Sequence, residues 1–565
     1  MFGQPPAFPP ARAPSYDYDF VVVGSGFGGS VSALRLSEKG YKVLVVEIGK
    51  RWRREDFPRT NMNVRKSLWI PKLLCYGIQR LSLLRDVLIL SGAGVGGGSL
   101  VYANTLLVPP DVAFERGGWP RDIPWKDTLA PHYQTAKRML GVTANPHLFE
   151  GDLALLDYAK SLGKEDTFHK TNVGVLFGDG PGQDVGDPFF GGEGPARTTC
   201  NLCGGCMVGC RFGAKNTLDK NYLFFAEKLG AEILPETRVR LLEERTDGGY
   251  AVHVEKSTSV LFKQRRVITA RQVVLSAGVL GTVDLLLRSQ EKGVLKRLSP
   301  TLGQQVRTNS EAILGASARK TEKDFSRGIA IASGFYPDPD THIEIVRYSR
   351  GSDALAPLAT LITDGGGGVP RPIRWLGNVV KHPVDFLRTL VPFGWARKTA
   401  ILLVMQTIDS SMRLVRRRRW LWPFSRSLTS EASPGQPPIP TYIPSGNEAA
   451  RQVAQRIGGY AQSAINEVLL DVPTTAHILG GACMGSSPQD GVVDAQNRVF
   501  GHQGLYVIDG SAIPGNLGVN PSLTITAMAE HAMSHVPLKD GVTELKALPP
   551  QARAATSDVK SAVQA

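Results

Sequence analysis

A glycine-rich turn between two apolar runs near the N-terminus is the feature that most constrains the fold. The run 19–23 is followed by Gly24-Ser25-Gly26-Phe-Gly-Gly29, and then by apolar residues at helical spacing. A second segment typical of a buried strand, 41–46, comes next. A strand, a helix and a strand in this order, with GxGxxG at the first turn, predict a dinucleotide-binding unit.

The glycines of this turn have separate tasks in such a unit. Gly24 makes the tight turn, Gly26 lets the backbone approach a diphosphate, and Gly29 lets the helix pack on the strand. The helix N-terminus adds N–H donors and the positive end of a dipole. Glu47 ends the second strand, close to where a carboxylate binds ribose hydroxyls. The spacing does not distinguish NAD from FAD.

A second glycine-rich run, 91–104, contains Gly97 and Gly98 and ends at Asn104. It either cradles another part of a long cofactor or forms a flexible loop.

Near the C-terminus, His477 precedes a strand that ends in Asp509-Gly510, and Asn520-Pro521 opens a helix. If the two ends of the chain meet, a cofactor lies between a nucleotide site and an acid/base site, which predicts redox chemistry on an alcohol.

The length and the net charge of the chain limit its domain organisation and its partners. A chain of 565 residues exceeds the size at which one core keeps growing, so we expect two lobes, built from interleaved segments. The net charge of +14 is partly clustered at Arg51–Arg54 and Arg416–Arg419. A solvated basic surface and attraction to an anionic membrane both fit this charge. No aromatic-basic reader module is visible, so we do not expect nucleic acid as a partner.

The ends of the chain predict tails rather than a targeting signal. Residues 1–16 are rich in Pro and Ala without an apolar core, and 539–565 lack periodicity, so we expect both to be disordered. No run of 18 or more uncharged apolar residues exists to span a bilayer. We expect a cytoplasmic protein, with contact at the inner face of the membrane as an additional prediction.

Several motifs together resemble one family. They are GSGFGGS with Glu47, GVGGGSLV, the run 273–278, and HxLGG…DGSxIPGxxGVNPxxTITA from His477 onward. The chain resembles the glucose–methanol–choline flavoprotein oxidoreductases, and within them the sterol-oxidising branch. This resemblance implies an α/β fold, with a Rossmann-like FAD-binding domain from discontinuous segments and an α+β substrate domain with an antiparallel sheet. The expected segments are 17–115, 197–310 and 470–538 for the first domain, and 116–196 and 311–469 for the second.

The resemblance also implies a cofactor and its contacts. It implies FAD, which we expect to be non-covalent because no His or Tyr stands where a flavin bond would form. The implied cofactor-binding residues are Gly24, Ser25, Gly26, Gly29, Glu47, Gly97, Gly98, Asn104, Val239, Asp509, Gly510 and Asn520. The sterol branch usually reads SLV-Asn where this chain has SLV-Tyr102-Ala-Asn104, so either Tyr102 or Asn104 takes the flavin-side position.

Three residues are candidates for catalysis. His477 suits removal of the hydroxyl proton near neutral pH, and Asn520 can hydrogen-bond the substrate oxygen without titrating. A core histidine bonded to backbone is the alternative for His477. Glu344, on an alternating strand with His342 and Val346, resembles the carboxylate that moves a proton between steroid ring carbons. An exposed glutamate paired with arginine is the alternative for Glu344.

The run Cys200-x2-Cys203-x2-Cys206-x3-Cys210 has the spacing of ferredoxin ligands. An iron–sulfur cluster, zinc on four thiolates and free thiols in a glycine-rich loop all fit this cysteine spacing.

Segment 361–426 mixes basic residues with Trp and Phe, which favours contact with a membrane surface. Ordinary packing of the lobe with a solvated arginine loop fits it as well.

Together these observations predict an FAD-dependent enzyme that oxidises the 3β-hydroxyl of a sterol and isomerises the Δ5 product to the Δ4 ketone. A long-chain fatty-alcohol oxidase or dehydrogenase of the same fold is the rival. A membrane-associated flavoprotein that binds sterol without turnover is an alternative of another class. The electron acceptor, molecular oxygen or another, is left open.

Overall fold

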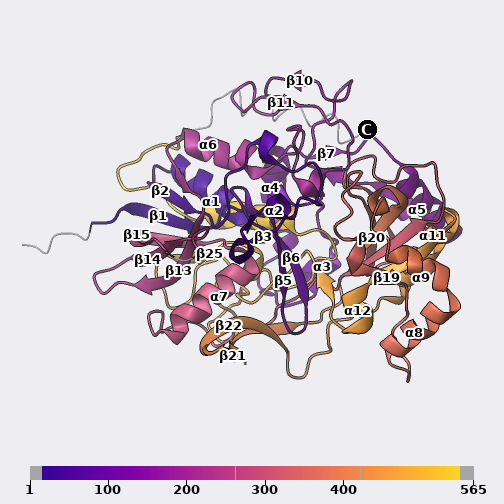
Figure 1. The fold of residues 1–565 in the computed structure, drawn as a ribbon. Coiled ribbons are helices and arrows are strands. Elements are labelled where there is room, and N and C mark those ends of the chain that lie inside the picture. The colour runs from indigo at the N-terminus through magenta and orange to yellow at the C-terminus, as the bar shows by residue number, and fades with distance from the viewer. Residues whose placement is uncertain (1–14, 261, 420–421, 547–565) are drawn as a thin grey trace, which may run out of the picture.

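The computed structural model describes residues 15–260, 262–419 and 422–546. Two large sheets lie side by side, each covered by helices (Figure 1). The helices of the described chain are α1 Phe27–Glu38, α2 Val64–Ser67, α3 Val112–Glu115, α4 Trp125–Met139, α5 Glu150–Ser161, α6 Tyr222–Lys228, α7 Gly278–Glu291, α8 Arg371–Lys381, α9 Pro383–Thr389, α10 Trp395–Lys398, α11 Pro444–Arg456, α12 Ile465–Leu469 and α13 Ser522–Ser534.

The first sheet contains the glycine-rich turn. The order of its strands is β12-β2-β1-β15-β14-β13, and β25 also pairs with β15. The strands are β1 Tyr18–Val23, β2 Val43–Val46, β12 Glu232–Leu234, β13 Thr237–Glu244, β14 Tyr250–Lys256, β15 Arg265–Leu275 and β25 Leu505–Val507. The pairs β12–β2, β2–β1, β1–β15 and β15–β25 are parallel. Parallel strands buried on both faces read as unbroken apolar runs, as 20–23 does in β1. Helices α1, α6, α13 and α4 pack together over one face, and α7 packs on the other.

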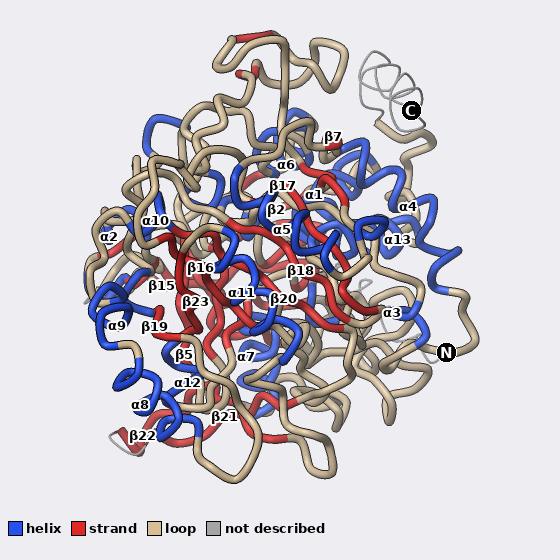
Figure 2. Tube along the Cα trace, turned by 90° about the vertical axis from the view of Figure 1, so that its right-hand side faces the viewer, coloured by secondary structure: helices blue, strands red, loops and turns tan. Residues whose placement is uncertain are grey.

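The second sheet is antiparallel throughout. Its order is β19-β23-β16-β20-β18-β17-β8, and the strands are β8 His169–Lys170, β16 Ala312–Ala318, β17 Ile331–Asp338, β18 Thr341–Val346, β19 Ala359–Leu361, β20 Thr399–Gln406 and β23 Gly459–Ala464. Helices α5 and α11 pack on this sheet, which crosses the middle of the tube view (Figure 2). The predicted fold class is therefore confirmed, including the discontinuous origin of the first sheet.

Shorter pairings complete the described structure. They are β24 Thr474–Thr475 with β6 Leu88–Gly92 and β5 Gln79–Leu83, β21 Met412–Arg419 with β22 Trp422–Ala432, β3 Trp69–Ile70 with β4 Cys75–Tyr76, β7 Thr143–Ala144 with β9 Asn172–Val173, and β10 Asp184–Val185 with β11 Arg197–Thr198. No helix of the described residues is long and apolar enough to cross a membrane.

Contacts at the C-terminal end bear on the tail predicted for 539–565. Lys539 pairs with Asp19 at 2.6 Å, and the amide of Lys546 donates to the carbonyl of Glu38. The remainder of that prediction, and most of the N-terminal one, lies outside the described residues. In the Arg416–Arg419 run, the side chain of Arg416 is 7% exposed and bonds Asp284 and Glu291, whereas Arg417 is exposed and pairs with Glu431.

Candidate active site

One continuous cavity of about 630 Å³ joins the two ends of the chain. Gly24 and Gly26 lie in its wall at the nucleotide end, and His477 and Asn520 lie in the same wall, although His477 is about 450 residues away in sequence. The volume is in the range of ligand sites in proteins. The meeting of the two ends, on which the sequence interpretation depends, is therefore a feature of the structure.

The glycines at the first turn are required by close backbone contacts. Gly24 has a φ of +100°, and a Cβ there would collide with the carbonyl of Ser276. A Cβ at Gly29 would collide with the carbonyl of Gly24, so Gly29 serves the helix packing and does not itself line the cavity. At Gly26 a Cβ would meet nothing within 4 Å, so the backbone is open to the cavity. The first turn of α1 has no side-chain cap, and its free N–H groups suit a diphosphate.

Glu47 lines the cavity and joins the two glycine-rich runs. Its Oε2 accepts from the amide and the hydroxyl of Ser25 at 3.1 and 2.7 Å. Its Oε1 accepts from the amides of Gly49 and Gly94 at 2.8 and 3.1 Å. Each oxygen thus has two protein donors. Glu47 organises both turns in addition to any contact with a ribose.

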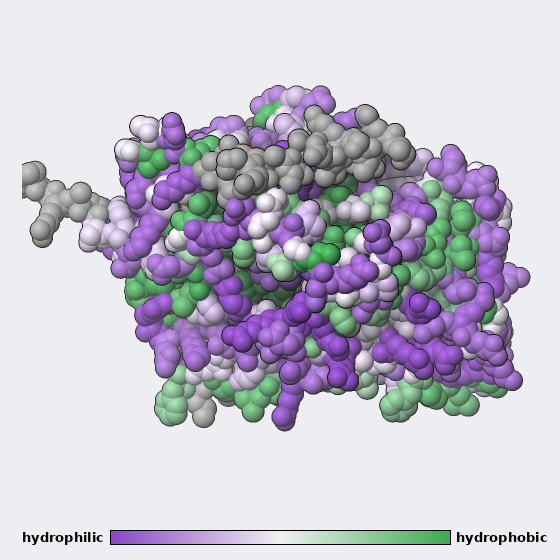
Figure 3. Space-filling view, turned by 90° about the horizontal axis from the view of Figure 1, so that it is seen from above, coloured by the Kyte–Doolittle hydropathy of each residue, from purple (hydrophilic) through white to green (hydrophobic). Residues whose placement is uncertain are grey.

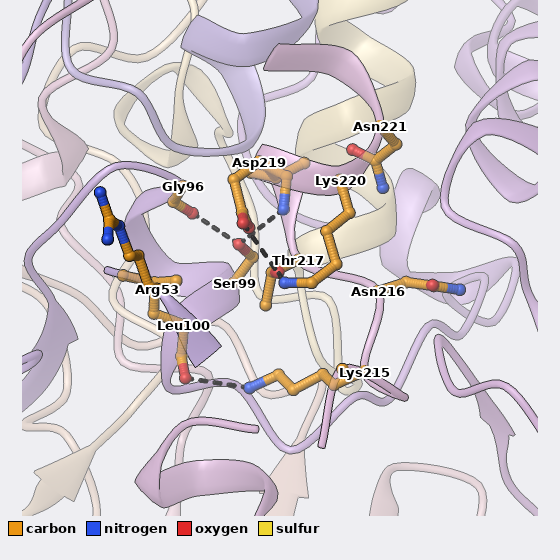
Figure 4. A network of polar contacts seen from close by, with 12 residues as sticks. Arg53, Gly96, Ser99, Leu100, Lys215, Asn216, Thr217, Asp219, Lys220 and Asn221 are labelled. Atoms are coloured by element: carbon orange, nitrogen blue, oxygen red, sulfur yellow. Dashed lines mark hydrogen bonds and ion pairs between the residues drawn. The ribbon is translucent and has the colours of Figure 1, made fainter. Parts of the chain in front are cut away.

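The second glycine-rich run is held by the segment that follows the cysteines (Figure 4). Ser99 donates to the carbonyl of Gly96 at 2.7 Å and accepts from the amide of Leu218 at 3.0 Å. The ammonium of Lys215 donates to the carbonyl of Leu100 at 3.0 Å, and burial lowers the pKa of Lys215 to about 7. This network fixes Gly97 and Gly98 in the cavity wall, so the run is a fixed part of the cradle rather than a loose loop.

The structure separates Tyr102 from Asn104. Tyr102 lines the cavity, and its hydroxyl donates to the carbonyl of Asn216 at 2.7 Å. Asn104 is fully buried with a φ of +72° and is not part of the cavity wall. Of the two residues considered for the flavin side, the geometry therefore favours Tyr102.

The remaining predicted cofactor contacts also lie in the cavity wall. Val239 comes from β13, and Asp509 and Gly510 follow β25. Asp509 accepts from the amide of Ser511 at 2.8 Å and from the hydroxyl of Thr282 at 2.5 Å. The carboxylate thereby caps the short helix at 510–512 and holds this turn against α7. Together with Gly26 and the uncapped end of α1, these residues line a cavity suited to a dinucleotide.

His477 is held by a carboxylate that sequence analysis missed. Its Nδ1 forms a short hydrogen bond with Glu311, whose other oxygen accepts from the amide of Ala476 at 2.8 Å. Burial lowers the pKa of His477, but the charge and hydrogen bond of Glu311 outweigh burial and raise it above the usual value. Because Nδ1 is engaged, Nε2 is the ring nitrogen left for a substrate. His477 is thus not a backbone-bonded core histidine.

A second missed residue, Asn309, positions the Asn520 loop. Its side-chain oxygen accepts from the amides of Leu517 and Gly518 at 3.1 and 2.8 Å, and its amide nitrogen donates to the carbonyl of Val519 at 3.0 Å. Asn309 itself has a φ of +60°, a left-handed conformation that Asn adopts more readily than most residues with a side chain. No sequence motif marks it. Its three side-chain contacts hold the loop from Leu517 to Val519 in place.

Glu344 lies behind Asn520 rather than in the cavity wall. The amide of Asn520 donates to Oε2 of Glu344 at 3.2 Å, while Oε1 has no hydrogen-bond partner in the described part of the chain. Burial raises the pKa of Glu344 to about 7, although Asn520 and His477 lower it. Glu344 is therefore not the exposed, arginine-paired glutamate that was the alternative. Glu311, His477, Asn520 and Glu344 form one buried polar group.

The four cysteines do not converge on a metal. Cys200, Cys203, Cys206 and Cys210 are free and border a separate cavity of about 240 Å³ together with Lys215. Across residues 15–260, 262–419 and 422–546, no three His, Cys, Asp or Glu side chains are placed to hold a metal ion. The ferredoxin-like spacing is therefore not matched by a ligand set, and neither the iron–sulfur nor the zinc interpretation is supported.

Comparison with known proteins places this site in a family. Models of the GMC oxidoreductases match residues 196–307 and 408–529, and a model of NAD(P)-binding Rossmann-like domains matches 22–53. A cholesterol oxidase from Acinetobacter baumannii is 47% identical over 538 residues, which cover 94% of this chain and 96% of that protein. The chain belongs to the GMC oxidoreductase family. It is accordingly an FAD-dependent oxidoreductase that acts on CH–OH groups.

Other relatives extend the comparison. A cholesterol oxidase from Mycobacterium tuberculosis is 49% identical over 545 residues, covering 95% of this chain and 93% of that protein. A long-chain-alcohol oxidase from Arabidopsis thaliana is 24% identical, covering 90% of this chain and 66% of that protein. Among solved structures, a pyridoxine 4-oxidase from Mesorbium loti superposes with a TM-score of 0.57 at 17% identity, covering 91% of this chain and 98% of that one. This last similarity concerns the fold alone.

Proposed function

We propose that the protein oxidises the 3β-hydroxyl of a sterol, with molecular oxygen as the electron acceptor. The observation that carries the proposal is the wall around His477 and Asn520, which is largely apolar. It includes Ile331, Val346, Leu355, Leu358, Trp395, Ile401 and Leu403 from the second sheet and its neighbours. A rigid apolar alcohol suits such a wall. The relatives named cholesterol oxidase, at 47 and 49% identity over nearly the whole chain, support the same substrate class.

In this proposal His477 removes the proton of the hydroxyl group. Glu311 orients the ring through Nδ1, so Nε2 receives the proton, and the carboxylate stabilises the imidazolium that results. Asn520 uses one amide hydrogen for Glu344, which leaves the other for the substrate oxygen. The two residues thus hold the hydroxyl so that its proton points at His477.

The cavity residues described above would hold FAD without a covalent bond. Gly24, Gly26 and the first turn of α1 would receive its diphosphate, and Gly98, Gly510 and the turn at 520–522 would border its ring system. FAD, when bound, supplies the two-electron acceptor for the hydride of the carbinol carbon. The backbone glycines and the apolar wall exclude water from that reaction.

Glu344 is proposed to move a proton between ring carbons and so convert the Δ5 ketone to the conjugated Δ4 ketone. Its pKa of about 7 means that the carboxyl can both accept and return a proton near neutral pH. Because Asn520 lies between Glu344 and the cavity, this step requires the Asn520 amide to move aside or the steroid ring to reach past it.

A visible spectrum of the purified protein under argon, with and without cholesterol, tests the proposal. We expect flavin absorbance that bleaches when cholesterol is added, followed by recovery on admission of oxygen. Turnover on cholesterol is then compared with turnover on C12–C16 primary alcohols. Bleaching by long-chain alcohols alone would assign the rival activity, and no bleaching by any alcohol would indicate a sterol-binding flavoprotein without turnover.

A membrane surface is the proposed source of the sterol. Apolar side chains on α8, α9 and the following loop are exposed, among them Val380 at 74% and Phe393 at 75%. They gather at the lower right edge of the molecule, where α8 and α9 lie (Figure 3). Lys381 and Lys398 are exposed beside them, and the loop leads directly to Trp395 in the cavity wall. Such a mixture suits an anionic bilayer surface.

Sedimentation with vesicles tests this contact. We expect the protein to pellet with vesicles that contain phosphatidylserine, and Val380→Asp with Phe393→Asp to reduce the bound fraction about tenfold, since a charge opposes insertion of the face. Leu162→Asp, at another exposed apolar position, is the matched control. Unchanged binding of the double variant would assign the contact to another surface.

A further inference from the structure

His342 is a buried histidine for which neither the fold nor the oxidation reaction accounts. The residue is 1% exposed, and neither ring nitrogen has a hydrogen-bond partner in the described part of the chain. Buried polar atoms without partners are costly and rare in native proteins. An apolar aromatic ring of the same shape would fill the space without this cost. A functional role would explain why a histidine, and not an apolar ring, occupies this position.

His342 lies between the active-site carboxylate and the edge of the second sheet. Gly334 on β17 pairs with Glu344 on β18 and with His169 on β8. Directly opposite residues on neighbouring strands point to the same face, so Glu344 and His169 share a face. His342, two residues from Glu344, is on that face as well.

The missing side chain of Gly334 opens the gap in which the His342 ring lies. A Cβ at Gly334 would come within 2.6 Å of Nε2 of His342 and 3.3 Å of Cγ of Glu344. Both groups therefore border the same small space. Oε1 of Glu344, like the two nitrogens of His342, has no partner within residues 15–260, 262–419 and 422–546.

On its other side His342 meets two rings that reach the surface. It stacks on Tyr336 with ring centroids 4.4 Å apart and on His169 at 5.2 Å. Both of these residues are half-buried. Nδ1 of His169 is bonded to the carbonyl of Thr167 at 3.1 Å, which leaves Nε2 of that ring free to accept a proton.

We propose that His342 connects Glu344 to solvent by way of His169. One proton leaves Oε1 of Glu344 for a ring nitrogen of His342 across the small space that both groups border. The other nitrogen of His342 releases its proton to water at the edge of the stack, and Nε2 of His169 accepts it from that water. The net change is one proton moved from a carboxyl group to solvent, with no change in oxidation state. Burial holds the pKa of His342 well below its usual value, so the ring is neutral and offers both a donor and an acceptor.

A proton path from Glu344 to solvent is useful if the bound substrate closes the mouth of the cavity. Alcohol oxidation releases a proton at His477, beside Glu344, while the sterol blocks the route back to water. A second route through the sheet lets the buried polar group equilibrate with solvent during turnover. This inference rests on the proposed function for its purpose, but its geometry does not depend on the substrate.

The test follows the exchange of the Glu344 carboxyl proton in the holoenzyme. Below the Glu344 pKa of about 7, the protonated carboxyl gives an infrared C=O band, which is identified as the difference between wild type and Glu344→Gln. After mixing into D2O the band shifts as the proton exchanges. We expect His342→Phe, which keeps the stacked ring and removes both nitrogens, to slow the shift at least about tenfold, because exchange then needs local opening.

Two controls bracket that result. Tyr336→Phe alters the same stack and leaves the path intact, so its exchange should match wild type. The carboxyl of Glu467, which burial gives a pKa of about 8 and which lies outside the path, should exchange equally in all variants. If His342→Phe does not fold, His169→Phe at the half-buried end tests the same route.

An exchange rate in His342→Phe and His169→Phe equal to that of wild type would overturn the proposal. Anaerobic bleaching of the flavin by cholesterol, measured on the same preparations, reports separately on the proposed function. Failure of bleaching in wild type would reject the sterol reaction and leave the exchange result standing.

Discussion

Two buried histidines, His477 and His342, are both close to Glu344 and yet differ in character. His477 has a carboxylate partner, Glu311, and its pKa is raised. His342 stacks on Tyr336 and His169 and has no hydrogen-bond partner in the described part of the chain, and its pKa is held well below the usual value. The same side chain is therefore a base with a stabilised charged form at one position and a neutral ring at the other.

The difference shows that the partner, and not burial, decides what a histidine can do. Burial lowers the pKa of both rings. At His477 the charge of Glu311 reverses the direction, which suits a group that must hold a proton during hydride transfer. At His342 nothing stabilises a charge, which suits a group that passes a proton without keeping it. The predictions below test this contrast.

Removal of His477 should have the largest effect. His477→Ala is expected to slow anaerobic flavin reduction by about a thousandfold, within the range for a general base. Stopped-flow absorbance with cholesterol measures the rate. His253→Ala, at a histidine paired with Glu243 away from the cavity, is the control and should leave the rate unchanged. A loss of less than tenfold in His477→Ala would mean that another group takes the proton.

Removal of the charge on Glu311 should come next. Glu311→Gln keeps the shape of the side chain but no longer stabilises the imidazolium, so we expect flavin reduction about ten- to a hundredfold slower. The pH profile gives a sharper result. A base must be neutral to act, so the rate of wild type rises with pH through the raised pKa of His477. In Glu311→Gln that pKa falls, and the midpoint should move to lower pH. An unmoved midpoint would show that Glu311 does not set this pKa.

Glu344→Gln should separate the two reactions. The amide can still accept a hydrogen bond from Asn520 but cannot carry a proton between ring carbons. We expect oxidation within about threefold of wild type and loss of conjugated enone absorbance in the product, because only the isomerisation needs a titrating group. Survival of the enone would assign isomerisation to another residue.

The sequence predicted those parts of the site that a short segment determines by itself. The turn at Gly24–Gly29 and the Asn520-Pro521 helix start are local, and both lie where expected. Glu311 could not be recognised, because its partner is 166 residues away and only the pairing of distant segments brings them together. The four cysteines show the opposite limit. Their spacing fits a metal site as well as free thiols, and in the described residues the fold places no ligand group for a metal ion. The choice between Tyr102 and Asn104, which the sequence left open, depends on the backbone at 97–104, which places Tyr102 in the cavity wall.

The smallest expected effect is on stability, and it bears on His342. If its two nitrogens have no partner, replacing the ring by an apolar one of similar shape removes unsatisfied polar atoms from the core. His342→Phe should therefore leave flavin reduction within about twofold of wild type and raise the free energy of unfolding by about 1 kcal/mol. Denaturant unfolding of the holoenzyme measures the change, with Tyr336→Phe as the control for the stacked rings.

A gain in stability together with slower proton exchange would mean that the native histidine lowers stability and is retained for its chemistry. A clear loss of stability would instead mean that the nitrogens are hydrogen-bonded in the folded protein, and the contrast with His477 would then fail.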